Sequence, residues 1–68
     1  MYVIKNLAND KYYKELEEHN HKLDADLKDA TVFDSQERAI SKASILHAEL
    51  STLGLGINFK VEVKENES

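Results

Sequence analysis

Two histidines, His19 and His21, have the spacing in this 68-residue chain that comes closest to a metal site. Residues two apart on a strand point to the same face, so both imidazoles could bind one ion. A zinc site needs three or four converging ligands, and Asp24, Asp26 or His47 would have to complete it. The simpler interpretation is a pair of exposed histidines in a turn, and we therefore expect no metal or other cofactor.

No catalytic arrangement accompanies these histidines. A general base at His47 would need a nucleophile or substrate within about 3 Å, and no nucleophile motif such as Gly-x-Ser-x-Gly occurs. The absence of cysteine excludes thiol catalysis and iron–sulfur clusters. Acidic residues could form a carboxylate pair, but so short a chain can hardly build a walled cleft around them. We expect that the protein is not an enzyme.

The charge balance argues against direct binding to nucleic acid. Nine basic and 13 acidic side chains give a net charge of −4, and Arg38 is the single arginine. Binding to phosphates needs clustered Lys and Arg. An acidic mimic of DNA is an alternative, because acidic residues gather between Glu15 and Asp29, although lysines interleave with them. A ribbon-type repressor is another, because a leading strand followed by two helices would match its order.

Three tyrosines and two helix residues are the candidates for contact with a protein partner. Tyr2, Tyr12 and Tyr13 have the large area and polar tip that are enriched at the centres of interfaces. On a strand, Tyr12 and Tyr13 would point to opposite faces, so that one is in the core and one is exposed. Ile45 and Ala48 lie off the main apolar stripe of their expected helix and could form a second strip for a partner.

The elements that position these residues are clearest in the last third of the chain. Asp34 and Glu37 predict a capped helix start, and an apolar stripe at helical spacing predicts an amphipathic helix over about residues 35–53. The stripe consists of Ala39, Ile40, Ala43, Leu46, Leu50 and Leu53. Gly54 is expected to end this helix in a Schellman motif.

Strand patterns occur at both ends of the chain. Apolar and polar residues alternate over 57–63, which predicts a strand with one buried and one exposed face. The aromatic and β-branched start favours a first strand over about residues 1–7. A single domain over 1–64 is what this length allows, and residues 65–68 are expected to form a frayed polar tail.

Residues 10–30 allow two interpretations. Helix-forming residues and apolar positions spaced by three and four from Tyr13 to Ala30 favour a helix. The stretch from Glu18 to His21 is weakly helical and turn-like, which favours a hairpin. The hairpin would have a strand at about 11–18 and a return after Asn20.

The two interpretations lead to different element orders. In the hairpin interpretation, Asp26 caps one helical turn over 27–29, and a short strand over 31–33 precedes the main helix. The order is then β-β-β-α-β, a small antiparallel sheet with one helix across a face. The alternative order is β-α-α-β with a helix at about 10–30, and both are α+β folds.

The segment 26–46, with MYVIKN at the start and KYY at 11–13, resembles small uncharacterised proteins of phages and prophages of low-GC Gram-positive bacteria. Their pattern is an opening strand, a second strand with paired tyrosines, and a motif that leads into a capped helix. The matching positions of that motif are Asp26, Leu27, Ala30, Phe33, Asp34 and Ala39. The stretch 15–24 departs from the pattern in its high charge. The resemblance favours the hairpin and implies an accessory protein that acts on a host protein.

We therefore expect a small cytoplasmic domain that works as a protein–protein interaction module. No membrane span or signal peptide is predicted, because the longest apolar run is a few residues near the start. A homodimer fits this expectation, because a thin core gains from pairing and a strand at 57–63 would need cover if it lies at an edge. The alternatives are a role related to nucleic acid and a metal-binding protein that uses His19 and His21.

Overall fold

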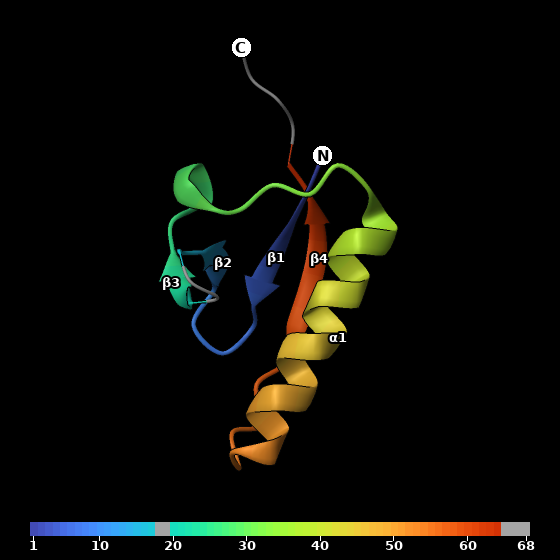
Figure 1. The fold of residues 1–68 in the computed structure, drawn as a ribbon. Coiled ribbons are helices and arrows are strands. Elements are labelled where there is room, and N and C mark those ends of the chain that lie inside the picture. Colours follow the sequence, from blue (N-terminus) through green and yellow to red (C-terminus); the bar gives the residue numbers. More distant parts are fainter. Residues whose placement is uncertain (18–19, 65–68) are drawn as a thin grey trace.

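The computed structural model describes residues 1–17 and 20–64. Its elements, in chain order, are β1 Tyr2–Asn6, β2 Lys11–Glu15, β3 His21–Ala25, the short 3-10 helix η1 Leu27–Asp29, α1 Gln36–Thr52 and β4 Phe59–Val63 (Figure 1). This order confirms the predicted β-β-β-α-β fold of the α+β class. The described part of 10–30 contains two strands and η1, so the alternative long helix is not observed. The predicted tail at 65–68 lies outside the described residues.

The four strands form one antiparallel sheet in the order β3-β2-β1-β4. β1 is rich in aromatic and β-branched residues, which favour extended backbone. Val3 and Ile4 are consecutive and point to opposite faces, yet both are fully buried. Both faces of the sheet are therefore covered at β1. β4 pairs with β1 alone and is an edge strand of the described sheet.

β1 and β2 pair at only two residue positions and then separate. The segment after η1 enters this gap, where the Thr31 N–H donates to the Tyr13 carbonyl (3.1 Å). Phe33 exchanges two backbone hydrogen bonds with Tyr2 (2.8 and 3.0 Å). Because these two residues bond to different strands, the short strand expected at 31–33 is reduced to a single bridge between Phe33 and Tyr2. The third strand of the sheet is β3, the return of the hairpin.

The ends of α1 lie close to the predicted positions, with one correction at the N-cap. Ser35, not Asp34, caps the helix, and its hydroxyl accepts a hydrogen bond from the Arg38 N–H (3.2 Å). The Asp34 carboxylate instead forms an ion pair with the Arg38 guanidinium (3.7 Å). At the other end, Gly54 has a φ of 81°. The N–H groups of Gly54 and Leu55 donate to carbonyls of the last turn, which is the predicted Schellman motif.

The core lies between α1 and the sheet. Its buried cluster consists of Ile4, Tyr13, Ala39 and Leu46, with Tyr2, Leu23, Phe33, Ala43, Phe59 and Val61 packed against it. The predicted helix stripe is buried at Ala39, Leu46 and Leu50, but Ile40 is 47% and Leu53 is 73% exposed. Figure 1 shows the reason for Leu53, because the last turns of α1 extend past the ends of β1 and β4.

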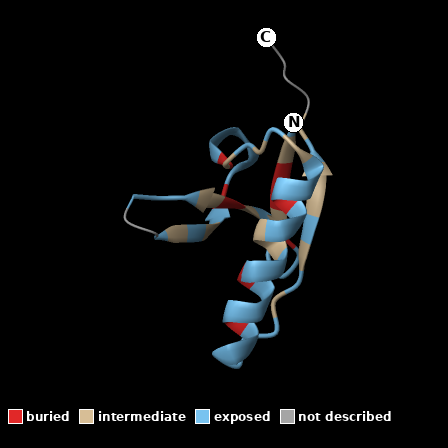
Figure 2. Cartoon of the chain, turned by 45° about the vertical axis from the view of Figure 1, so that its right-hand side comes forward, coloured by how far each residue is buried: buried red, intermediate tan, exposed pale blue. Residues whose placement is uncertain are grey.

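The hairpin of β2 and β3 projects sideways from the part of the fold in which α1 packs on β1 and β4 (Figure 2). Two lysines of β2 contact acidic residues that follow β3 in the chain. The Lys11 ammonium lies 3.3 Å from the Asp26 carboxylate, and the Lys14 ammonium donates to the Asp29 carbonyl (3.2 Å). The carboxylate of Asp26 therefore pairs with Lys11 and makes no capping hydrogen bond to η1. None of the helices in the described residues has the length and apolar character to cross a membrane.

Candidate functional site

The tyrosines singled out in the sequence lie in different environments. Tyr13 lies in β2 where the pairing with β3 shifts register, opposite the two residues Leu23 and Asp24 of β3, and it is 1% exposed. Its ring stacks on Phe33, with 6.3 Å between centroids, and the Lys42 ammonium lies 5.8 Å from its centroid. Burial, followed by the charges of Glu15 and Glu49, raises the pKa of Tyr13 to about 12. The side chain of Tyr13 is thus a part of the core.

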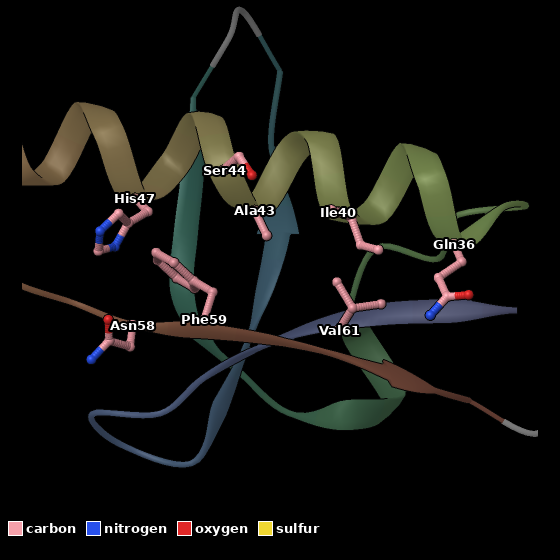
Figure 3. A pocket seen from close by; sticks show the side chains of 8 residues that line it. All are labelled: Gln36, Ile40, Ala43, Ser44, His47, Asn58, Phe59 and Val61. Atoms are coloured by element: carbon pink, nitrogen blue, oxygen red, sulfur yellow. The ribbon is translucent and has the colours of Figure 1, made fainter.

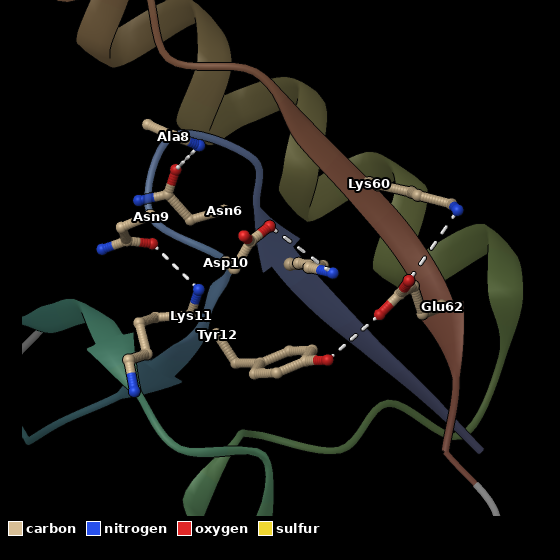
Figure 4. A network of polar contacts seen from close by, with 9 residues as sticks. Asn6, Ala8, Asn9, Asp10, Lys11, Tyr12, Lys60 and Glu62 are labelled. Atoms are coloured by element: carbon tan, nitrogen blue, oxygen red, sulfur yellow. Dashed lines mark hydrogen bonds and ion pairs between the residues drawn. The ribbon is translucent and has the colours of Figure 1, made fainter.

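Tyr12 lies on the face of the sheet opposite to α1, as expected for a strand neighbour of Tyr13. Its hydroxyl donates to the Glu62 carboxylate (3.2 Å), and Glu62 also pairs with Lys60 (3.7 Å) (Figure 4). Burial, followed by the charge of Glu62, raises the pKa of Tyr12. Tyr2 is half-buried and packs against the core. Both tyrosines are therefore engaged in contacts within the fold.

Ile45 and Ala48 are exposed on α1, and Ile45 is 50% exposed. The five residues predicted to contact a partner are therefore spread over the core, the sheet face opposite to α1 and the surface of α1. The structure does not bring them together into one surface. A binding site has to be sought where several exposed groups converge.

The histidine pair gives no metal centre in the described residues. His19 lies outside them. His21 is half-buried, and its ring lies 5.8 Å from that of Tyr13 between centroids. Over residues 1–17 and 20–64, no three His, Asp or Glu side chains are grouped closely enough to hold a metal ion.

A groove runs between α1 and β4 (Figure 3). It has a volume of about 500 Å³ and is lined by Gln36, Ile40, Ala43, Ser44 and His47 of α1 and by Asn58, Phe59 and Val61. The helix residues recur every three or four positions, so they share one face of α1. The lining combines aliphatic and aromatic surface with amide and hydroxyl groups.

His47 lies at one end of the groove, beside Asn58 (Figure 3). Its Nδ1 is 2.9 Å from the Ile57 carbonyl oxygen. A carbonyl only accepts, so Nδ1 carries the proton in this hydrogen bond. The bond ties the loop before β4 to α1. The Ser44 hydroxyl also lines the groove, but the described hydrogen bonds do not join it to His47, so the geometry shows no activated nucleophile.

β4 borders the groove with unpaired backbone groups. In an antiparallel ladder, hydrogen-bonded pairs alternate with non-bonded pairs. The backbone bonds of Asn58 (3.0 Å) and Lys64 (2.8 Å) to the residues that flank β1 define which residues of β4 bond inward. Phe59, Val61 and Val63 therefore direct their N–H and C=O groups away from β1. In the described chain, no strand lies on that side.

The same three residues carry apolar side chains. Phe59 and Val61 are half-buried against the core, while Val63 is 68% exposed. We call the outward backbone and the side chains of Phe59, Val61 and Val63 the β4 edge. Sequence reasoning placed this strand and named it as an edge that a homodimer could cover, but did not select its residues as a site. The signal was the alternation over 57–63, which marks a strand without indicating its neighbours.

Comparisons of the chain with protein-family models, curated proteins and solved structures found no match. The proposals below therefore rest on the geometry of the described residues and on the sequence pattern.

Proposed function

We propose that the chain is a non-enzymatic protein-binding module that adds an extended segment of another polypeptide to the β4 edge. The observation that carries this proposal is the coincidence, at Phe59, Val61 and Val63, of unpaired backbone groups and apolar side chains beside a groove. In strand addition, backbone hydrogen bonds provide affinity and alternate side chains provide specificity. The β4 edge offers both.

The groove would select the side chains of the added strand. A strand paired with β4 would lie about 4.8 Å from it, and every second side chain would point to the side of α1. Those side chains would meet Ile40, Val61 and Phe59, which favour apolar residues. Gln36 and Ser44 offer hydrogen-bonding groups on the same wall. The preferred segment is therefore an extended stretch with alternating apolar residues.

The biological setting is proposed from the sequence alone. The pattern over 26–46 supports an accessory protein of a phage or prophage that acts on a host protein. The lack of cysteine suits a reducing, cytoplasmic compartment. A homodimer is compatible with the same edge, since an exposed edge strand is a template for pairing with any suitable strand.

Val63→Pro tests the proposal because it removes one outward N–H from the β4 edge. Proline is tolerated in edge strands where the missing N–H faces solvent, and Val63 contributes little to the core because it is exposed. Val63→Thr is the matched control, since it keeps the N–H and the β-branched shape. Circular dichroism would verify that both variants fold.

The assay is a tagged pull-down from a lysate of a low-GC Gram-positive bacterium, read by mass spectrometry at two salt concentrations. We expect the wild-type chain and Val63→Thr to retain the same polypeptide in stoichiometric amount, and Val63→Pro to lose it. Equal retention by Val63→Pro would show that binding does not use the β4 edge. A partner lost only at higher salt, equally by all three chains, would instead favour the acidic-mimic alternative.

A further inference from the structure

We propose that a second copy of this chain occupies the β4 edge, in an antiparallel β4–β4 pair with Val61 on the two-fold axis. This inference rests on the proposed function, because it names the polypeptide that the same edge would bind. A two-fold pair uses one surface twice, so the surface must be complementary to itself. β4 can be tested for this property residue by residue.

The backbone of β4 allows only certain registers. Phe59, Val61 and Val63 point their N–H and C=O groups outward, so these residues must form the hydrogen-bonded pairs of the new ladder. With Val61 opposite Val61 of the second copy, Phe59 stands opposite Val63 of that copy. Each of the outward residues then exchanges backbone hydrogen bonds with its counterpart. No outward group of the strand is left over.

The charges of β4 favour this register over the two whose axis passes one residue to either side of Val61. With Val61 on the axis, Lys60 faces Glu62 of the second copy, and Glu62 faces Lys60. A register with Lys60 on the axis would place two lysines opposite each other, and one with Glu62 on the axis would oppose two glutamates. Like charges directly opposite on neighbouring strands are destabilising, whereas opposite charges stabilise the pair. The sequence of β4 is therefore self-complementary around Val61.

The position of the helix agrees with the same arrangement. α1 contacts both β1 and β4, which is consistent with an axis above the space between these two strands. Strands are about 4.8 Å apart, which would place the two α1 helices about 10 Å apart across the axis. Packed helices are separated by about 8–10 Å. Ile40 and Ser44, on the groove side of α1, would then face the second helix, and the groove would be closed.

The dimer also covers what the single chain leaves exposed. Val63, 68% exposed, would lie beside Phe59 of the second copy on the side of α1. Ile40, 47% exposed, would lie between the two helices. The joined sheet would place β4 in its interior and leave β3 as the strand at each end.

Charge reversal tests the register in the full-length chain by analytical ultracentrifugation over a wide range of concentration. Lys60→Glu would oppose glutamates, and Glu62→Lys would oppose lysines, at two symmetric places in each dimer. We expect each single variant to weaken the dimer by about tenfold or more. The double variant Lys60→Glu/Glu62→Lys restores opposite charges and is expected to return to wild-type affinity. An equimolar mixture of the two single variants is expected to form a mixed dimer.

Two outcomes would overturn the inference. A chain that stays monomeric at the highest concentration shows that the β4 edge does not bind a second copy. A dimer that is insensitive to both charge reversals and to Val63→Pro uses another surface. The proposed function is judged separately, by whether Val63→Pro loses a different polypeptide that the wild-type chain and Val63→Thr retain. A monomer that passes that test would contradict the proposed dimer but would still support strand addition at the β4 edge.

Discussion

Alkaline pH is expected to destabilise this fold through Tyr13. Burial raises the pKa of its phenol from 10 to about 12, so the folded chain keeps a proton that the unfolded chain releases. The corresponding stability is complete below pH 10 and is lost as the pH rises from 10 to 12. At a little over 1 kcal/mol per pKa unit, the loss is about 1 kcal/mol at pH 11 and approaches about 3 kcal/mol above pH 12.

Tyr13→Phe isolates this contribution because it removes the titrating hydroxyl and keeps the ring against Phe33. The assay is urea unfolding of both proteins at pH 8 and pH 11, followed by far-UV circular dichroism. Lysines and the other tyrosines titrate in both proteins, so the difference between the two reports Tyr13. We expect the wild-type chain to lose about 1 kcal/mol more than Tyr13→Phe, or about 1 M in urea midpoint for an m-value of about 1 kcal/mol/M.

Tyr12→Phe serves as the control for this experiment. The pKa of Tyr12 is also raised, but its side chain is half-buried, and its removal is expected to leave most of the alkaline loss in place. A parallel loss of stability in the wild-type chain and Tyr13→Phe would refute the reasoning, because it would show that the phenol ionises as easily in the folded chain as in the unfolded one.

Two matched pairs of substitutions and one single substitution test the packing and the helix ends by urea unfolding. Leu46→Ala should cost about 2–5 kcal/mol because Leu46 is buried, whereas Leu53→Ala should stay within about 0.5 kcal/mol; equal costs would contradict the described core. Gly54→Ala should cost about 1–2 kcal/mol because of its positive φ, while Gly56→Ala, with open space around it, should cost little. Ser35→Ala should cost about 1 kcal/mol by removing the N-cap bond to α1, and no loss would mean that another group caps the helix.

Local patterns were sufficient for most of the elements. The 3.6-residue stripe and Gly54 predicted α1 to within one residue at each end, and the alternation over 57–63 predicted β4. The N-cap was misplaced by one residue, since Asp34 and Ser35 are both good caps. The Ser35 hydroxyl accepts from the Arg38 N–H, whereas the Asp34 carboxylate pairs with the Arg38 guanidinium. A periodic sequence pattern predicts a helix or strand well where neighbouring residues do not compete for the same hydrogen-bonding groups.

The structure of the middle of the chain was harder to predict, because the contacts that determine it join residues that are distant in sequence. Helix-forming residues around Glu15 become a strand because Tyr13 is buried against Phe33 and the backbone of Thr31 bonds to β2. The expected strand at 31–33 became a bridge for the same reason. Intrinsic preference is a weak prior that tertiary packing overrides.

The candidate site was the least predictable part. The tyrosines have the composition typical of interfaces, but Tyr13 is in the core, and Tyr12 bonds to Glu62 within the chain. The β4 edge exists because of the order of the strands in the sheet. The alternating pattern of one strand does not reveal that order. The resemblance to phage proteins stays a prediction.

Amide hydrogen exchange along β4 tests the central claim most directly. In the dilute, unassociated chain we predict that the amides of Lys60 and Glu62, which bond to β1, are protected, while those of Phe59, Val61 and Val63 exchange rapidly. On association, either with a captured partner or with a second copy, the three outward amides should become protected. Outward amides that stay rapid on association, while protection arises on another surface, would contradict strand addition at the β4 edge.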